Sequence, residues 1–206
     1  MEIITLTKEH PYYPDELKET NLTLRAIGNL EILKLKSKRI AVVGSRDATY
    51  DGIYYAKRIT RALVNKGYII VSGGARGIDT VAFETTIEYN GNFILVIAEG
   101  IRNYISSYKF NAVKKHLKNV VVISQYNDYD TWTGYRAMLR NETIIRLSNV
   151  VVVVESIKVE HSGSFACGKR ALELGKDVYV VNPNLFKTKP AGNVELVKLG
   201  AKTLNF

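Results

Sequence analysis

Short runs of apolar, mostly β-branched residues alternate with longer segments of helical spacing from Lys38 onward. Each run is nearly continuous in apolar residues, which is typical of strands buried on both faces of a parallel sheet. We expect strands at Arg39–Val43, Tyr68–Val71, Phe93–Ile97, Val120–Ile123, Val150–Val154 and Val178–Val181. We expect helices at Tyr50–Lys66, Gly77–Tyr89 and Ser164–Leu174. The alternation predicts an α/β fold: a Rossmann-like, doubly wound, mostly parallel sheet with helices on both faces.

Residues 1–37 lack this alternation. They contain Pro11 and Pro14, a short apolar stretch at Leu22–Ile27 and a turn at Gly28–Asn29. No linker separates them from the following residues, so we expect one domain over residues 1–206. Residues 1–37 are then a short N-terminal extension packed on that domain.

Composition narrows the class of protein and its partners. The formal net charge is +9, and an excess of positive charge favours polyanions such as nucleic acid. The single cysteine, Cys167, excludes an intramolecular disulfide and a thiolate metal cluster. The sequence shows neither a secretory signal pattern nor an apolar run near the ~20 residues that span a bilayer. We therefore expect a cytoplasmic protein without a membrane partner.

Three loops that each follow an expected strand and precede an expected helix carry the candidate binding residues. In an open parallel sheet, ligands bind beyond the carboxyl ends of the strands. Glycines let backbone N–H groups approach an anion, helix N-termini add favourable partial charge, and arginines offer a fork suited to phosphate. The residues of these loops are Gly44, Ser45 and Arg46; Ser72, Gly73, Gly74, Arg76, Gly77 and Asp79; and Ser162, Gly163 and Ser164. Together they predict a composite phosphate-binding surface, with Asp79 supporting the helix that starts at Gly77.

Two common nucleotide-binding motifs do not fit these loops. The stretch after the first strand is GSRDAT rather than G-x-G-x-x-G, and Ser72 stands where an acidic residue would hold a ribose, so NAD is not expected. Gly163–Lys169 matches G-x-x-x-x-G-K, but Arg170 follows instead of Ser or Thr, and the interior is expected to be helical. We expect no cofactor.

Conventional catalytic sets are also missing from the sequence. His10, His116 and His161 lack metal-ligand spacing, although His161 lies beside the Ser162 loop. Cys167 lies on an apolar helix face, which favours a core residue over a nucleophile. Glu155 ends a strand and either contacts a sugar or lines the cleft. We therefore expect a binding protein, with no catalytic residues and no metal ligands, rather than an enzyme.

An aromatic segment precedes two further polar candidates, Arg140 and Asn141. Its aromatic residues are Tyr126, Tyr129, Trp132 and Tyr135. Aromatic rings between cations can stack on unpaired bases while the cations hold the backbone. The alternative is that the rings pack this segment onto the sheet or form a subunit contact.

These motifs together resemble the DNA-processing protein A (Smf/DprA) family. The resemblance covers most of the chain and rests on Ala41–Arg46, Val71–Asp79, Arg140–Asn141, Val153–Glu155 with Ser162–Ser164, and Asn182–Pro183 with Gly192–Asn193. It implies a Rossmann-like protein that binds single-stranded DNA in transformation or recombination. It further implies that Arg46, Arg76 and Arg140 lie in the DNA-binding pocket, that the protein is a homodimer, and that a RecA-type recombinase is a partner.

Three positions depart from the family pattern. Phe83 stands where the family usually has histidine, Ala137–Leu139 where it has Phe-Pro, and Glu142 where it has an arginine. Two other functions stay open: a nucleotide-binding sensor of the same superfamily and a nucleotide phosphoribohydrolase. The hydrolases use a glutamate after a Gly-Gly-x-Gly-Thr loop, whereas Phe165, Ala166 and Cys167 follow the Ser162 loop here.

Overall fold

Strands from along the whole described part of the chain form a single sheet. The computed structural model describes residues 2–206, and all of their side chains except that of Ser37. Within those residues, nine strands form one sheet in the order β1-β2-β6-β5-β4-β3-β7-β8-β9. The strands are β1 Ile4–Leu6, β2 Leu24–Gly28, β3 Arg39–Val43, β4 Ile69–Ser72, β5 Phe93–Val96, β6 Val120–Ser124, β7 Val150–Val153, β8 Asp177–Val181 and β9 Lys202–Leu204.

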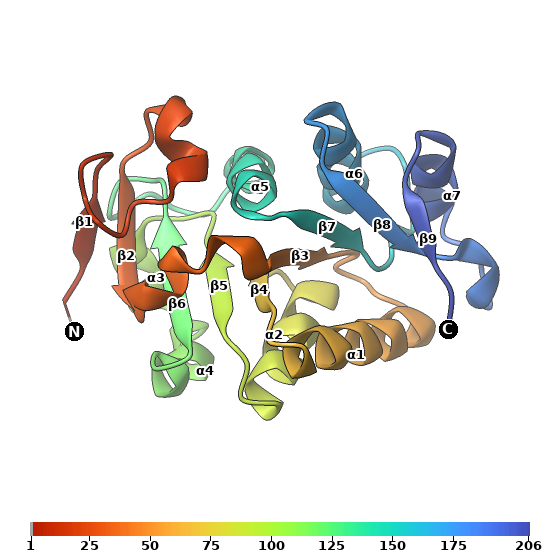
Figure 1. Ribbon diagram of the computed structural model, residues 1–206, viewed down its shortest axis with the longest axis horizontal. Coiled ribbons are helices and arrows are strands. Elements are labelled where there is room, and N and C mark those ends of the chain that lie inside the picture. The colour runs from red at the N-terminus through yellow and green to blue at the C-terminus, as the bar shows by residue number, and fades with distance from the viewer. Residues whose placement is uncertain (1) are drawn as a thin grey trace.

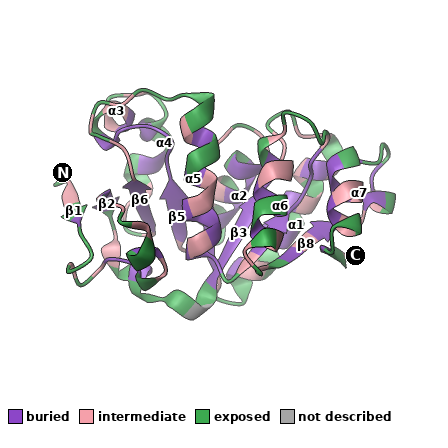
Figure 2. Cartoon of the chain, turned by 90° about the horizontal axis from the view of Figure 1, so that it is seen from above, coloured by how far each residue is buried: buried purple, intermediate pink, exposed green. Residues whose placement is uncertain are grey.

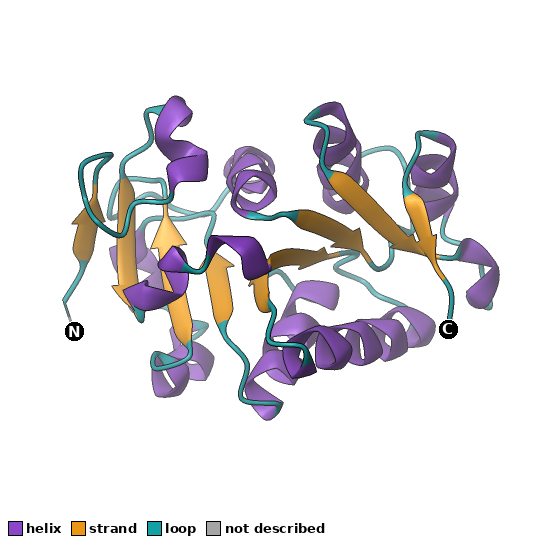
Figure 3. Ribbon diagram, viewed as in Figure 1, coloured by secondary structure: helices purple, strands orange, loops and turns teal. Residues whose placement is uncertain are grey.

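The α-helices lie between these strands along the chain (Figure 3). They are α1 Tyr50–Asn65, α2 Ile78–Glu88, α3 Ile101–Ile105, α4 Phe110–Val113, α5 Gly134–Leu147, α6 Gly163–Glu173 and α7 Ala191–Lys198. Short 3-10 helices are η1 Asp15–Thr20, η2 Leu30–Lys34, η3 Lys36–Lys38, η4 Lys114–His116 and η5 Pro183–Leu185.

Helices cover both faces of the sheet, as the alternating pattern predicts. Figure 1 shows α5, α6 and α7 on one face and α1, α2 and α4 on the other. Two apolar clusters correspond to these layers: one includes Ile144 of α5 and Leu196 of α7, and the other includes Ala56 of α1 and Ile78 of α2. The strands between them are buried along almost their whole length (Figure 2). The α/β, Rossmann-like fold class is therefore confirmed.

The six strands expected from the sequence are β3 to β8: β3 has the expected bounds, and each of the other five differs by one residue at one or both ends. They pair in parallel, as does β9 with β8. The chain runs from β3 outward to β6 and then returns to the other side of β3 with β7. The topological switch point is therefore between β3 and β7, where a doubly wound sheet opens a crevice at its carboxyl edge.

The N-terminal extension does more than pack on the domain, because it adds two strands to the sheet. Strand β2 pairs antiparallel with β6, and β1 pairs antiparallel with β2. A buried arginine also ties the extension to the central strand: the guanidinium of Arg39 forms an ion pair with Glu16 at 3.3 Å and donates to the carbonyl of Leu33. Met1 lies outside the described residues. Among residues 2–206, no helix is long and apolar enough to cross a bilayer.

Candidate anion-binding site

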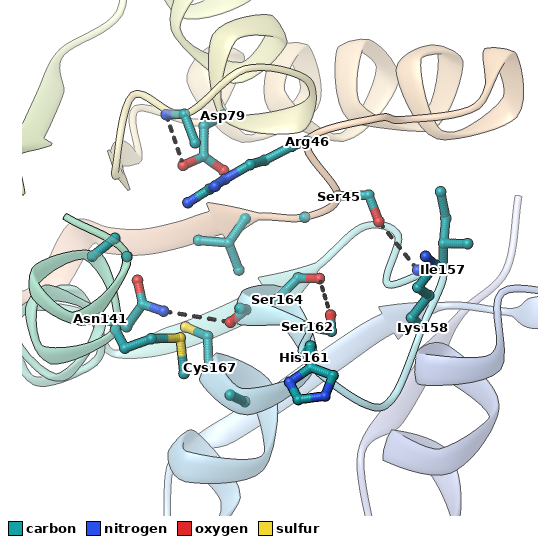
Figure 4. A pocket seen from close by; sticks show the side chains of 18 of the residues that line it. Ser45, Arg46, Asp79, Asn141, Ile157, Lys158, His161, Ser162, Ser164 and Cys167 are labelled. Atoms are coloured by element: carbon teal, nitrogen blue, oxygen red, sulfur yellow. Dashed lines mark hydrogen bonds between the residues drawn. The ribbon is translucent and has the colours of Figure 1, made fainter. Parts of the chain in front are cut away.

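A pocket of about 700 Å³ opens at the switch point (Figure 4). Its walls come from the loop after β3, from the first turns of α5, and from the loop that joins β7 to α6. Nine of the residues predicted from the sequence line it: Gly44, Ser45, Arg46, Asp79, Arg140, Asn141, Ser162, Gly163 and Ser164. Residues that are far apart in the chain therefore meet at one site.

Ser45 joins the two loops at the base of the pocket. Its backbone N–H donates to the carbonyl of Glu155 at 2.8 Å, and its hydroxyl accepts a hydrogen bond from the N–H of Ile157 at 3.1 Å. Gly44 must lack a side chain, because a Cβ there would collide with Ile78. Arg46 directly follows this anchored residue, so the hydrogen bonds of Ser45 hold the backbone of Arg46 at the pocket.

The Gly73–Gly74 loop already encloses an anion, which is the carboxylate of Asp79. One carboxylate oxygen of Asp79 accepts the N–H groups of Gly73 at 3.2 Å and of Ala75 at 3.3 Å. This carboxylate is buried in the protein, so the two N–H groups are occupied from within. We expected the backbone N–H groups of this loop to hold a ligand phosphate. At these two positions, however, no N–H group is free to donate to a phosphate.

Five predicted site residues lie outside the lining of the pocket: Ser72, Gly73, Gly74, Arg76 and Gly77. Ser72 is fully buried and donates to the carbonyl of Val42 at 2.7 Å. Gly77 has a φ of +80°, and a Cβ there would overlap the carbonyls of Ser45 and Arg46. Its role is to let the two glycine loops approach each other. The guanidinium of Arg76 pairs with Asp47 at 2.7 Å on the surface.

Arg140 is a buried cation in the wall of the pocket. Its Nη1 donates to the carbonyl of Val96 at 2.9 Å, while its Nε has no hydrogen-bond partner among the described residues. Burial lowers the pKa of Arg140, and the nearby charge of Asp79 opposes this shift. Burial likewise raises the pKa of Asp79, against the charge of Arg140 and the N–H groups of the loop. Each charge partly compensates the desolvation of the other.

A group of hydroxyls marks the N-terminus of α6, where the helix meets the pocket. The hydroxyl of Ser162 caps the helix by accepting the N–H of Phe165 at 3.2 Å. It lies 3.1 Å from the hydroxyls of both Ser156 and Ser164. Because α6 begins at Gly163, the interior of the G-x-x-x-x-G-K match is helical and cannot form a phosphate-binding P-loop. Two of these hydroxyls, those of Ser162 and Ser164, line the pocket together with the helix N-terminus, a setting that favours an anion.

Sequence reasoning missed one cation of the pocket, Lys158, which lies in the loop between β7 and α6. The position of this loop after a strand at the switch point is the signal that would have found it. His161 of the same loop also lines the pocket and has a φ of +52°. Cys167 reaches the pocket from α6, and burial raises the pKa of its thiol to about 12. The thiol is therefore protonated at neutral pH, as expected for a core cysteine.

Two of the three departures from the family pattern, Glu142 and Phe83, have partners within the fold. Glu142 lies outside the lining of the pocket and pairs with Arg146 at 2.9 Å and with Arg170 at 2.8 Å. Phe83 packs edge-on against Phe93. Glu155, which could have contacted a ligand, is fully buried and accepts the N–H of Thr49 at 2.9 Å.

The aromatic segment before α5 has two kinds of ring. The hydroxyl of Tyr126 donates to the carbonyl of Arg136 at 2.6 Å, so this ring packs the segment onto its own helix. Tyr129 and Tyr135 are about three-quarters exposed. Trp132 is 44% exposed, and the guanidinium of Arg46 lies 5.2 Å from the centre of its ring. Trp132 thus holds a pocket cation while part of its own face remains accessible.

The fold and the pocket define a Rossmann-like α/β protein with a basic, hydroxyl-rich cavity at its topological switch point. The chain belongs to the DNA recombination-mediator protein A family, whose model matches residues 3–205. The chain is 29% identical over 198 residues to the DNA processing protein DprA of Bacillus subtilis, covering 96% of this chain and 66% of that protein.

Two solved structures are similar to this chain. DNA processing protein A from Streptococcus pneumoniae superposes with a TM-score of 0.86 at 28% identity, over 99% of this chain and 71% of that one. DNA processing protein A from Helicobacter pylori shares the fold, with a TM-score of 0.83 at 23% identity, over 98% of this chain and 91% of that one. The chain spans between about half and two thirds of the length of most curated relatives that it matches.

Proposed function

We propose that the protein binds single-stranded DNA in the switch-point pocket and acts in DNA processing or recombination. The observation that carries the proposal is the charge of the pocket. Arg46, Lys158 and the buried Arg140 line it, beside the N-terminus of α6. Its two lining carboxylates are both engaged, Asp47 with Arg76 and Asp79 with the Gly73 loop. A phosphate entering the pocket therefore meets cations and hydroxyls.

The relatives support a nucleic-acid ligand. The H. pylori structure is described as showing a single-stranded DNA binding mode of that protein, and the B. subtilis relative is named for DNA processing. The net charge of +9 agrees with a polyanionic partner. The family resemblance also supports a homodimer, a RecA-type recombinase as partner and a cytoplasmic location, which we include in the proposal.

In this proposal, unpaired bases stack on the exposed part of the Trp132 ring. The ring lies beside Arg46, so a phosphate held by the guanidinium and a base stacked on the indole can belong to one strand. Stacking of this kind tolerates any base because every base has a π face. The protein would therefore show little sequence preference.

The proposed role is binding rather than catalysis. A phosphoribohydrolase of this fold needs a glutamate after the glycine loop, and the carboxylates that line the pocket are Asp47 and Asp79. Because Asp79 accepts two backbone N–H groups and is buried, it is poorly placed to act as a general base.

A nucleotide-binding sensor is the second candidate. It is favoured by the size of the pocket, since about 700 Å³ is within the usual range for small-molecule sites. The two candidates differ in reach: a sensor needs the pocket alone, whereas a DNA-binding protein contacts phosphates beyond it.

Fluorescence anisotropy with a labelled oligo-dT of about 20 nucleotides, over a salt series, tests the proposal. We expect tight, salt-sensitive binding by the wild type and a loss of about tenfold for Arg46→Ala, because this cation lines the pocket. Arg76→Ala is the matched variant, since Arg76 is an exposed arginine outside the lining, and we expect a smaller loss. No binding at low salt would reject the DNA proposal. A thermal shift with a mononucleotide in that case would support the sensor.

A further inference from the structure

Helix α1 carries a second basic surface that is separate from the switch-point pocket. A shallow pocket of about 230 Å³ is lined there by Tyr54, Lys57, Arg58, Arg61 and Tyr89. The first four residues follow helical spacing on one face of α1, and Tyr89 comes from the end of α2. All five side chains are exposed. We call these five residues the α1 surface.

The cations of the α1 surface are not used to hold the fold together. None of Lys57, Arg58 and Arg61 forms an ion pair anywhere in residues 2–206. The exposed carboxylates of α2, Glu84 and Glu88, form no ion pair with them either. Three cations on one helix face repel one another, and an external polyanion reduces that repulsion.

Aromatic rings lie among these cations. The hydroxyl of Tyr54 accepts a hydrogen bond from Nη1 of Arg58 at 3.1 Å, and the same guanidinium lies 5.0 Å from the ring centre of Phe206. These contacts orient the fork of Arg58 on the surface. Cations that alternate with exposed tyrosines are the combination that holds single-stranded nucleic acid, with phosphates on the cations and bases on the rings.

The α1 surface follows the first loop of the switch-point pocket along the chain. Arg46 lines that pocket, and α1 begins four residues later at Tyr50, which is 85% exposed. From Tyr50 the helix extends to Arg61 over about 16 Å. Figure 1 shows α1 on the outer side of its layer, with no element covering its outward face. A strand that leaves the pocket past Arg46 and follows α1 would meet Tyr50, then Tyr54, and then the cations.

We infer that the α1 surface is a second contact site for single-stranded nucleic acid and holds the part of the strand that extends beyond the switch-point pocket. This inference rests on the proposed function. It assigns the sugar-phosphate backbone to Lys57, Arg58 and Arg61, with bases against Tyr54 and Tyr89. With the α1 surface, the binding site would extend over more than one nucleotide. A DNA-binding protein needs such an extended site, whereas a nucleotide sensor does not.

The test compares two lengths of oligo-dT, about 6 and about 30 nucleotides, because only the longer strand can occupy both sites. The variant is Lys57→Ala/Arg58→Ala/Arg61→Ala. The control is Lys114→Ala/Lys115→Ala/Lys118→Ala, which removes the same charge from exposed lysines outside both pockets. Far-UV circular dichroism and thermal melting check the fold of each variant. The double variant Lys57→Ala/Arg61→Ala keeps the packing of Arg58 on Phe206.

For the α1 variant we expect unchanged affinity for the short strand and a loss of about tenfold or more for the long strand. Its salt slope should fall by about 2, because each lost phosphate contact contributes about 0.7 on single strands. Equal losses in the α1 variant and the control, or no loss in either, would overturn the inference. Failure of the wild type to bind both strands would instead reject the proposed function itself.

Discussion

The guanidinium of Arg140 occupies the space in which Gly73 would carry a side chain. A Cβ at Gly73 would overlap Nη1 of Arg140, and the other two atoms in its way also belong to that guanidinium. Gly73 is therefore required by a buried cation rather than by a ligand. The same loop N–H donates to Asp79, so the loop, the carboxylate and the cation form one packed unit behind the pocket.

Gly73→Ala should destabilise the protein by about 2 kcal/mol, because the added methyl group overpacks a buried site. Gly134→Ala is the control: a Cβ there meets nothing within 4 Å, and alanine is the better helix former. Urea denaturation measures both. The double variant Gly73→Ala/Arg140→Ala should lose less than the sum of its single variants, because the overlap disappears. Strict additivity would contradict the proposed contact.

Trp132→Ala should weaken binding of single-stranded DNA by about 1–2 kcal/mol, since a stacked base contributes in this range. Trp132→Phe should retain most of the affinity because it keeps a π face. Tyr108→Ala is a control at a highly exposed ring outside the pocket lining and should bind like the wild type. Anisotropy titrations at one fixed salt concentration give the comparison. Equal effects of the Trp132 and Tyr108 variants would place the bases elsewhere.

Asn193→Ala should lower the free energy of unfolding by about 2–3 kcal/mol, because it leaves buried polar groups without partners. The amide of Asn193 accepts the N–H of Ser156 at 2.7 Å and donates to the carbonyls of Val154 and Val181 at 3.0 Å each. It thus joins the ends of β7 and β8 below the serine cluster of α6. Chemical denaturation checks the change, and Asn184→Ala on the surface is the control.

Glu142→Gln should cost about 1 kcal/mol at pH 7, a modest value because the ion pairs are partly exposed to solvent. Hydrogen bonds from Arg170, and less strongly from Arg146, lower the pKa of Glu142 against the effect of burial. A folded-state pKa below the unfolded one stabilises the protein above the unfolded pKa of about 4.3. This contribution is lost as the pH falls through the folded-state pKa.

The wild type and Glu142→Gln should therefore converge in stability as the pH is lowered below about 4. Thermal melts at a series of pH values measure this convergence. Glu173→Gln is the control, since Glu173 contacts Arg170 at 3.3 Å and is more exposed, and its effect should be smaller. A gap that stays constant down to pH 3 would show that the charge of Glu142 contributes nothing.

The parallel part of the sheet was predictable because its strands are buried on both faces and therefore carry continuous apolar runs. Strands β3 to β8 all have this signal. Strands β1 and β9 have three residues each and lie at the two edges, so they bury little apolar surface. Strand β2 appeared in the sequence only as a short apolar stretch. Its place in the sheet depends on its pairing with the distant strand β6, which the local sequence does not show.

The part of the site that was predictable from the sequence is the part that follows from the position of each loop relative to the strands. Loops after β3 and β7 meet at the switch point, so Arg46 and Ser162 lie together as expected. The Gly73 loop was different, because its sequence shows available N–H groups but not the buried Asp79 carboxylate that occupies two of them. Tertiary packing decides which N–H donors remain free, so a local sequence motif cannot show it.

The antiparallel pairing of β2 with β6 has a consequence for the order in which the chain folds. Arg25 pairs with Ser124 and Gly28 with Val121, so the residues of β2 leave the ribosome well before the residues of β6 with which they pair. Until then their backbone groups face solvent as an unpaired edge, which is the state most prone to misassociation. Pairing of β2 with the sheet is thus a late, long-range step, although β2 is synthesised before the strand with which it pairs.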